Sequence, residues 1–175
     1  MSDSTDDLVI RALGPQDPPV LEAAFAAIGW NKQASRYERY LVEQADGIRD
    51  ILVAELEGVF AGYGTLLWRA TYPPFRDASI PEVQDLNVLP HLHRRGVASR
   101  LMDEAESRIA ARGDTAGIGF GMTENYGAAQ RMYVLRGYVP DGRGLMYNEQ
   151  PVEYFGPAVI PDDDLVLYLT KRLDR

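Results

Sequence analysis

Apolar residues recur along the chain with two periods, and the N-terminal part shows the shorter one clearly. Apolar runs at residues 7–13, 51–56 and 59–68 contain the residue types that favour strands, so each predicts a strand. Only Glu57 and Gly58 separate the second run from the third, and a two-residue connection of this kind is typical of a β-hairpin. We therefore expect the sheet to begin with antiparallel pairing.

The residues between the first two of these runs show the spacing of helices. Asp17 is followed by two prolines, which makes it a predicted N-cap, and the alanine-rich residues 20–28 predict the helix after it. Residues 32–44 predict a second helix, in which Tyr37 and Tyr40 recur at helical spacing. We expect these aromatic residues in the core, although they could also line a pocket.

The C-terminal part alternates strands with helices. It predicts strands at residues 82–88, 116–122 and 165–173, a strand-like continuation from Tyr138, and helices at 95–112 and 125–136. Residues 69–80 predict a loop, and residues 141–161 a long loop or irregular hairpin, because both are interrupted by prolines and isolated aromatic residues. The pattern indicates an α/β fold (α+β in some schemes), with a mixed, largely antiparallel central sheet of six to seven strands flanked by about four helices.

Length and composition narrow the class of protein. The chain has 175 residues, which fits one domain at residues 7–175 after a polar, flexible tail at residues 1–6. Hydrophobic residues make up 46% and charged residues 25%, as in soluble globular proteins. The acidic start is the reverse of a signal peptide, and no apolar run could span a membrane, so we expect a cytoplasmic protein without a membrane partner. A formal net charge of −8 disfavours nucleic acid as a partner.

The sequence lacks the residues that several other kinds of chemistry require. Cysteine is absent, which excludes a thiol nucleophile. His91 and His93 form a His-x-His pair, but no third ligand follows at a metal-binding spacing, so we expect no metal site. No Gly-x-x-x-x-Gly-Lys-Ser/Thr motif is present, and the three glycines in residues 117–121 lie inside a predicted strand, where a dinucleotide fingerprint would not function. These glycines suit a strand that splays or lies under a ligand.

One junction between a strand and a helix carries the strongest candidate chemistry. Residues 86–90 end a strand, and residues 91–99 lead into the amphipathic helix. The first N–H groups of a helix have no partner inside it, and the helix dipole places about half a positive charge there, so phosphate oxygens are well matched to this position. Gly96 would let a pyrophosphate approach the backbone, and Arg94 and Arg95 add positive charge. The alternative interpretation is an ordinary turn with exposed arginines.

The same junction resembles a known signature. Residues 93–98 read His-Arg-Arg-Gly-Val-Ala, which is similar to the Gln/Arg-x-x-Gly-x-Gly/Ala motif of the GNAT family of acyl-CoA-dependent N-acetyltransferases. Residues 86–90 read Leu-Asn-Val-Leu-Pro and resemble the Leu-x-Val-x-Pro strand that precedes this motif in the family. His93 is a departure, because it stands where the family usually has Gln or Arg.

A second block supports the resemblance. Asn125, Ala128 and Tyr133, followed by Gly-Tyr at residues 137–138, are similar to the family's second conserved segment. The resemblance implies a GNAT fold, acetyl-CoA as co-substrate, a loop that grips its pyrophosphate through backbone N–H groups, and a strand that exposes backbone groups to the pantetheine arm. The implied cofactor-binding residues are Leu86, Val88, His93, Arg94, Arg95, Gly96, Val97, Ala98, Ser99, Asn125 and Ala128.

The resemblance also implies a reaction, in which an amine attacks the thioester directly without a covalent enzyme intermediate. A lysine-like amine must first lose a proton, so a carboxylate or a water chain leading to one is needed. Glu82 and Asp85 are the candidates, and Glu82 is preferred because it shares a strand face with Leu86 and Val88. The Val88 N–H is expected to stabilise the oxyanion, and Tyr133 to protonate the leaving thiolate.

The predicted function is therefore acetyl transfer from acetyl-CoA to a primary amine of a small molecule or peptide. The alternative is a non-catalytic acyl-CoA-binding sensor or regulatory module that keeps the phosphate site without turnover. The identity of the amine, the preferred acyl chain and the formation of a homodimer all stay open at this point.

Overall fold

The computed structural model describes residues 7–174, which form two compact units. The first unit comprises the residues up to 68 together with 83–108, and the second comprises 69–82 together with the residues from 109 onward. The tail predicted at residues 1–6 lies outside the described residues. The assignment of residues 7–175 to one domain stays a prediction.

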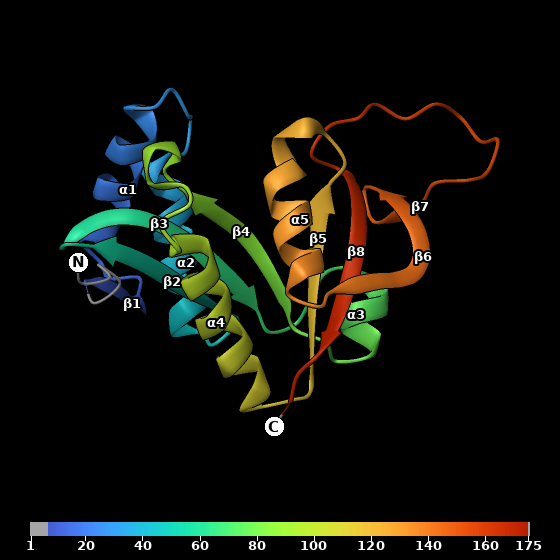
Figure 1. Ribbon diagram of the computed structural model, residues 1–175, viewed down its shortest axis with the longest axis horizontal. Coiled ribbons are helices and arrows are strands. Elements are labelled where there is room, and N and C mark those ends of the chain that lie inside the picture. The colour runs from blue at the N-terminus through green and yellow to red at the C-terminus, as the bar shows by residue number, and fades with distance from the viewer. Residues whose placement is uncertain (1–6, 175) are drawn as a thin grey trace. The chain divides into compact units, whose positions relative to one another are not determined.

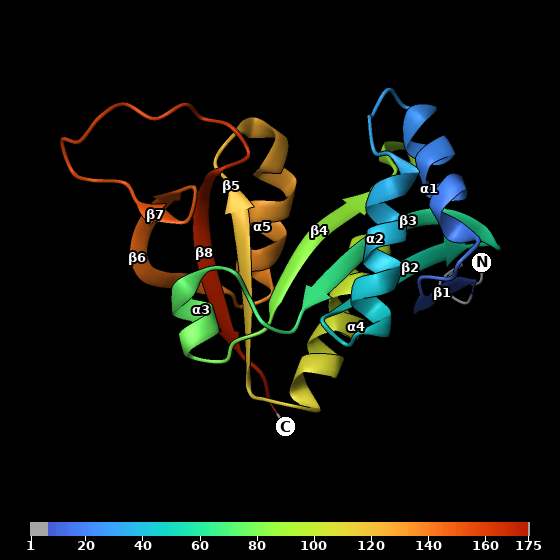
Figure 2. The same cartoon turned by 180° about the vertical axis from the view of Figure 1, so that it is seen from behind.

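The first unit is a sheet with helices on both of its faces (Figures 1 and 2). Its elements are β1 (Leu8–Ala12), α1 (Asp17–Ala26), α2 (Ala34–Ala45), β2 (Arg49–Leu56), β3 (Val59–Leu67), β4 (Glu82–Val88), η1 (Pro90–Leu92) and α4 (Val97–Ala110). The strands follow the order β1-β2-β3-β4, and β1 and β3 both run antiparallel to β2. Helices α1 and α2 lie on one face, and α4 lies on the other. The strands and helices predicted for this region are confirmed, with shifts of a few residues at their ends.

The connection between β2 and β3 is the predicted hairpin turn. Leu56 pairs directly with Val59, and the two residues between them, Glu57 and Gly58, have φ values of 55° and 75°. Positive φ at both central residues is the mark of a type I′ turn, whose twist matches that of the flanking strands. The turn therefore fixes the register of the two strands.

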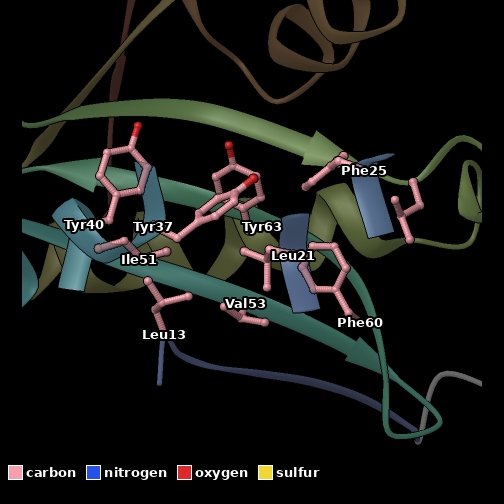
Figure 3. Packing of buried hydrophobic residues seen from close by; sticks show 10 residues of the cluster. Leu13, Leu21, Phe25, Tyr37, Tyr40, Ile51, Val53, Phe60 and Tyr63 are labelled. Carbon is pink, nitrogen blue, oxygen red and sulfur yellow. The ribbon is translucent and has the colours of Figure 1, made fainter. Parts of the chain in front are cut away.

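A cluster of buried apolar side chains lies between the α1–α2 pair and the sheet (Figure 3). Tyr37 and Tyr40 of α2 belong to it, which confirms their expected place in the core. Tyr37 also packs edge-on against Tyr63 of β3, with 5.4 Å between the ring centroids. Aromatic pairs in this geometry stabilise a core beyond the area they bury.

Asp17 does not cap α1 as predicted, because it is the first residue of the helix and Gln16 holds the N-cap position. Its carboxylate instead accepts a hydrogen bond from the Gly14 N–H (2.6 Å) and two from the guanidinium of Arg11 (2.6 and 2.8 Å). The side chain thereby ties the end of β1 to the start of α1.

The second unit has four strands and two α-helices among the described residues. Its elements are α3 (Pro73–Asp77), β5 (Thr115–Gly121), η2 (Glu124–Tyr126), α5 (Gly127–Leu135), β6 (Val139–Tyr147), β7 (Gln150–Pro151) and β8 (Leu165–Arg172). The strand order is β5-β8-β6-β7, and β8 runs antiparallel to both β5 and β6. Within this unit α5 lies on one face of the strands and α3 on the other (Figures 1 and 2). The strands predicted at residues 116–122 and 165–173 are confirmed.

One local prediction for the second unit was wrong. Helix α3 stands in the predicted loop at residues 69–80, with prolines in its first turn, where the missing N–H has no helical partner to lose. Strands β6 and β7 pair antiparallel, and β6 has a register shift against β8, so the irregular hairpin predicted within residues 141–161 is confirmed. The helix predicted at 125–136 is confirmed as α5, and the residues before it form η2. The mixed α/β class is confirmed, with eight strands and five α-helices in residues 7–174, slightly more than expected. In the same residues, no helix combines the length and the apolar character needed to cross a membrane.

The glycines of β5 make room for aromatic rings. A Cβ at Gly117 would lie 2.5 Å from the ring of Phe75, and one at Gly119 would lie 2.9 Å from the ring of Tyr168. A Cβ at Gly121 would likewise lie too close to the ring of Tyr126. The suggestion that these glycines lie under a ligand is therefore replaced by close packing of neighbouring side chains.

Candidate active site

The segment that opens α4 leaves its backbone donors unused. The helix begins at Val97, and the N–H of Arg100 donates to the carbonyl of Gly96 at 3.0 Å. Within residues 7–174, the N–H groups of residues 94–99 donate no hydrogen bond to a protein acceptor. They stay available at the positive end of the helix dipole, which is where an anion is stabilised.

The backbone of this loop has the geometry of an anion-binding nest. Arg94 and Gly96 have positive φ values, 64° and 81°. Alternation of such residues with ordinary ones turns successive N–H groups toward the same side. A Cβ at Gly96 would meet no heavy atom within 4 Å, so the space beside these amides is open. The loop therefore fits a diphosphate group on its backbone alone.

Side chains add positive charge and an anchor to the loop. Arg94 and Arg95 are exposed, and Arg95 lies 3.7 Å from the carboxylate of Glu57. Val97 is buried beneath the loop, whereas Ala98 is half-buried and Ser99 is exposed. The buried side chain of Val97 thus anchors the loop, while the side chains of Arg94 and Arg95 are exposed to solvent.

His93 holds the loop to β4. Its Nε2 lies 3.0 Å from the carbonyl oxygen of Val88, and because a carbonyl can only accept, Nε2 must carry the proton. The imidazole therefore orients the loop, and its departure from Gln or Arg does not remove a backbone donor. His91 is exposed, and among the described residues no three side chains of metal-ligating type lie together.

Strand β4 is held closely against β3 just before this loop. A Cβ at Gly62 of β3 would lie 2.5 Å from the carbonyl oxygen of Asn87, and Gly64 contacts the side chain of Leu86. Val88 is buried, and Leu86 is half-buried. The residues that resemble the family's pantetheine-binding strand are thus fixed in position by glycines of their neighbour.

Asp85 interrupts the regular geometry of β4. Its φ is 49°, which a non-glycine residue in a strand rarely adopts, and the Asn87 side-chain amide donates to its carbonyl at 2.9 Å. The Tyr40 hydroxyl donates a hydrogen bond to the Asp85 carboxylate, and Nη1 of Arg36 lies 3.8 Å from the same carboxylate oxygen. Strained residues of this kind gather at functional sites. The sequence nominated Asp85, but it missed Tyr40 and Arg36.

Three tyrosine hydroxyls lie on the side of the core that faces Asp85. Figure 3 shows the hydroxyls of Tyr37, Tyr40 and Tyr63 on the same side of the cluster. Burial raises the pKa of Tyr37 and of Tyr40 to about 12, with a further upward contribution from the negative charge of Asp85 in each case. The pKa of Tyr63 is raised for the same two reasons. These hydroxyls therefore stay protonated at neutral pH, and that of Tyr40 donates to the carboxylate.

The other predicted site residues lie in the second unit. Glu82 is 4% exposed, and Tyr133 packs between Phe120 and Tyr138, with centroid distances of 6.2 and 6.1 Å. Burial, followed by a contribution from Tyr126, raises the pKa of Tyr133, so its hydroxyl stays protonated at neutral pH. Asn125 and Ala128 are exposed. Asn125 belongs to η2, whereas Ala128 and Tyr133 belong to α5.

Comparison with protein families identifies the class. The family model described as the acetyltransferase (GNAT) family matches residues 19–138, which is more than half of the chain. The chain therefore belongs to the GNAT family and is an acetyl-CoA-dependent N-acetyltransferase. No curated protein sequence matches it significantly.

Solved structures share its fold at low sequence identity. The Salmonella typhimurium protein yncA, solved with its cofactor acetyl-CoA, has a TM-score of 0.68 and 18% identity over 97% of this chain and 95% of its own. A Salmonella typhimurium acetyltransferase that modifies the N-terminal serine of ribosomal protein L7/L12 has a TM-score of 0.70 and 13% identity over 98% of both chains. A spermidine N-acetyltransferase chimera from Vibrio cholerae and hSSAT has a TM-score of 0.66 and 17% identity over 94% of this chain and 95% of its own.

Proposed function

We propose that the protein transfers the acetyl group of acetyl-CoA to a primary amine of a small molecule or peptide by direct attack. One observation carries this proposal. The N–H groups of residues 94–99, at the N-terminus of α4, donate to no acceptor among the described residues, and the space beside Gly96 is open. A diphosphate is the anion that a chain of backbone donors at a helix terminus suits best. Family membership makes the diphosphate of CoA the expected ligand.

The proposal assigns the co-substrate to named residues. The amides of residues 94–99 would hold the diphosphate, with added charge from Arg94 and Arg95. The backbone of Leu86 and Val88 would run beside the pantetheine arm, as the family resemblance implies. Asn125 and Ala128, both exposed, would contact the same co-substrate. His93 would act indirectly, by fixing the loop against β4.

The amine must lose a proton before it attacks. For a lysine-like amine with a pKa of about 10.4, this costs roughly 4 to 5 kcal/mol at pH 7. Glu82, nearly completely buried, is our proposed acceptor of the proton, directly or through water. Asp85 is the alternative, because it is the more exposed carboxylate of β4 and has a hydrogen-bond donor in place.

The remaining steps balance the charge. The neutral amine attacks the acetyl carbonyl, a C–N bond forms, and the negative charge on the carbonyl oxygen is stabilised by the N–H of Val88. The C–S bond then breaks, the thiolate of CoA takes a proton from the hydroxyl of Tyr133, and the extra proton on the attacking nitrogen returns to Tyr133. This role requires a protonated tyrosine, which the upward pKa shift of Tyr133 supports.

The loop can be tested with two glycine variants. Gly96→Ala would force a Cβ onto a residue with a φ of 81° and into the space proposed for the diphosphate, whereas Gly47→Ala does the same at a φ of 70° with equally open space at the end of α2. Both variants should lose similar stability, about 1 kcal/mol. Only Gly96→Ala should weaken acetyl-CoA binding, by tenfold or more in titration calorimetry.

Turnover is measured separately, by thiol release from acetyl-CoA with a panel of primary amines. Thiol release with at least one amine supports the proposal. Binding of acetyl-CoA without thiol release for any amine would support the non-catalytic sensor instead. Absence of both binding and thiol release would remove the proposal altogether.

A further inference from the structure

The ion pair between Arg36 and Asp85 is longer than the short, hydrogen-bonded ion pairs of the first unit. Its nitrogen and oxygen are 3.8 Å apart, beyond hydrogen-bond distance, and the two side chains are 40% and 29% exposed. By contrast, Arg49 contacts Glu43 at 2.6 Å and Arg108 contacts Asp50 at 2.9 Å. The Arg36–Asp85 pair therefore presents a positive and a negative group side by side, open to solvent and not locked together.

The guanidinium of Arg36 keeps its hydrogen-bonding capacity. Among the described residues, Asp85 is its one charged partner, and at 3.8 Å that contact consumes no N–H donor. A guanidinium has five such donors in a planar fork, which matches a carboxylate bidentately. Arg36 can therefore bind a carboxylate without first giving up a hydrogen bond to the protein.

The backbone and the side chain of Asp85 are held in a conformation that a regular strand does not have. Its φ of 49° departs from the extended backbone of β4, and the Asn87 amide and the Tyr40 hydroxyl fix its carbonyl and its carboxylate. One carboxylate oxygen receives Tyr40, which leaves the carboxylate able to accept a further donor. An ammonium group is the donor that a partly exposed carboxylate favours most.

The charges around the pair argue against a simple cationic acceptor. Besides Arg36, the guanidinium of Arg49 lies 4.9 Å from the ring centroid of Tyr40, and that of Arg39 lies 5.6 Å from it. Arg39 and Arg49 share the single carboxylate of Glu43, whereas Asp85 is the one charged partner of Arg36 among the described residues. An amine that brought only positive charge to Asp85 would leave Arg36 without compensation. An amine that also carried a carboxylate would satisfy both groups.

We propose that the acceptor of this acetyltransferase is an amino acid, with its ammonium group on Asp85 and its carboxylate on Arg36. The inference rests on the proposed function and names the substrate class for that same site. In an α-amino acid a single carbon separates the two charged groups, which suits a carboxylate and a guanidinium that lie side by side. The ammonium gives one proton to the β4 carboxylate that acts as base, and the neutral nitrogen forms its bond to the acetyl carbon. The C–S bond then breaks, the nitrogen loses its second proton, and CoA leaves as the thiol with a proton relayed through Tyr133. The products are the N-acetyl amino acid and CoA.

The first test compares acceptors that differ only at the carboxylate. Each of a set of α-amino acids is assayed for thiol release beside its primary amide and its decarboxylated amine. The free acid should exceed both partners by at least tenfold in kcat/KM for the preferred side chain. A preference for the amide or the decarboxylated amine, or for a peptide N-terminus or polyamine in the same assay, would overturn the proposal.

The second test uses variants of α2. Arg36→Gln should raise the KM for the amino acid at least tenfold, with little change in kcat and none in the KM for the matching amide, and Arg36→Lys should recover part of the loss. Arg39→Gln is the control, because Arg39 lies on the same helix and pairs with Glu43 at 3.5 Å. Equal effects of Arg36→Gln on the acid and the amide would show a structural role and reject the inference.

A failure of the proposed function gives a different result. If acetyl-CoA binds but no amine releases thiol, calorimetric titration of the same amino acids in the presence of CoA still tests the pair. Binding that Arg36→Gln weakens tenfold and Arg39→Gln leaves unchanged would support the site without catalysis. No binding of any amino acid to the wild-type protein would reject it.

Discussion

Two ion pairs in the first unit each join an arginine to an aspartate but differ in geometry and exposure. Arg11 and Asp17 are joined by two short hydrogen bonds, the Gly14 N–H adds a third to the carboxylate, and Arg11 also donates to Glu55 at 2.6 Å, so this closed pair has its charges satisfied within the protein. Arg36 and Asp85 stand apart at 3.8 Å and are more exposed at the carboxylate, with side-chain exposures of 29% for Asp85 and 12% for Asp17. A closed pair stabilises the fold, whereas an open pair keeps its charges available to a ligand. Removing one carboxylate from each pair separates the two roles.

The largest effect is expected at the open pair. Asp85→Asn should lower kcat/KM for the preferred amine by about a hundredfold or more, because the amide cannot hold an ammonium group with a full charge. The free energy of unfolding should change little, since asparagine tolerates positive φ. Steady-state kinetics and denaturant unfolding measure the two quantities.

Glu82→Gln is the companion variant for Asp85→Asn. If Glu82 is the base, Glu82→Gln should lower kcat with little change in KM, whereas Asp85→Asn should act mainly on KM. The reverse pattern would assign the base to Asp85. Unchanged kinetics in both variants would remove the carboxylates of β4 from the mechanism.

The closed pair should show the opposite behaviour. Asp17→Asn should lower the free energy of unfolding by about 2 kcal/mol, because a buried carboxylate loses charge-assisted hydrogen bonds. The kinetics of the folded protein should be unchanged. Asp77→Asn is a suitable control, since Asp77 is 72% exposed and contacts only its sequence neighbour Arg76, at 3.3 Å. A loss of activity in Asp17→Asn without a loss of stability would contradict this division of roles.

A smaller effect is expected at high pH. Burial, with a further contribution from Asp85, raises the pKa of Tyr40 to about 12, above the ordinary value of about 10. Because the folded protein holds this proton more tightly, the stabilisation is complete below about pH 10 and is lost as the pH rises toward 12. Tyr40→Phe should therefore unfold with a flatter pH profile than the wild-type protein in this range. Parallel profiles for the two proteins would show that the shift at Tyr40 contributes nothing to stability.

The sequence predicted most elements because local signals set them. Glu57 and Gly58 fixed a turn, and the spacing of apolar residues identified α4, so both appear where expected. Strand β6 was predicted only as a continuation from Tyr138 and a loop or irregular hairpin, because Gly142 and Gly144, with φ values of 84° and 75°, accompany a register shift against β8 and hide the alternation of the strand. The backbone donors near Gly96 were predictable because a helix terminus follows from a local pattern.

The acceptor side of the site could not be predicted in the same way. Nothing in the local sequence shows that Asp85 has a positive φ, because aspartate adopts extended geometry in most strands. Its partner Tyr40 lies 45 residues earlier and was assigned to the core from its spacing, which is also correct. When a side chain buries its ring in the core and places its hydroxyl against a distant carboxylate, only the burial leaves a signal in the local sequence.

The glycines of β5 carry a consequence for how this strand tolerates change. Gly117 packs against the ring of Phe75 and Gly119 against the ring of Tyr168, so each glycine leaves the space that one aromatic neighbour occupies. Enlarging such a glycine alone should be harmful, but enlarging it together with a trimmed ring, as in Gly117→Ala with Phe75→Leu, should recover much of the loss. A substitution at one of these glycines would then require a compensating substitution of the ring that it contacts, because the size of one side chain limits the size of the other.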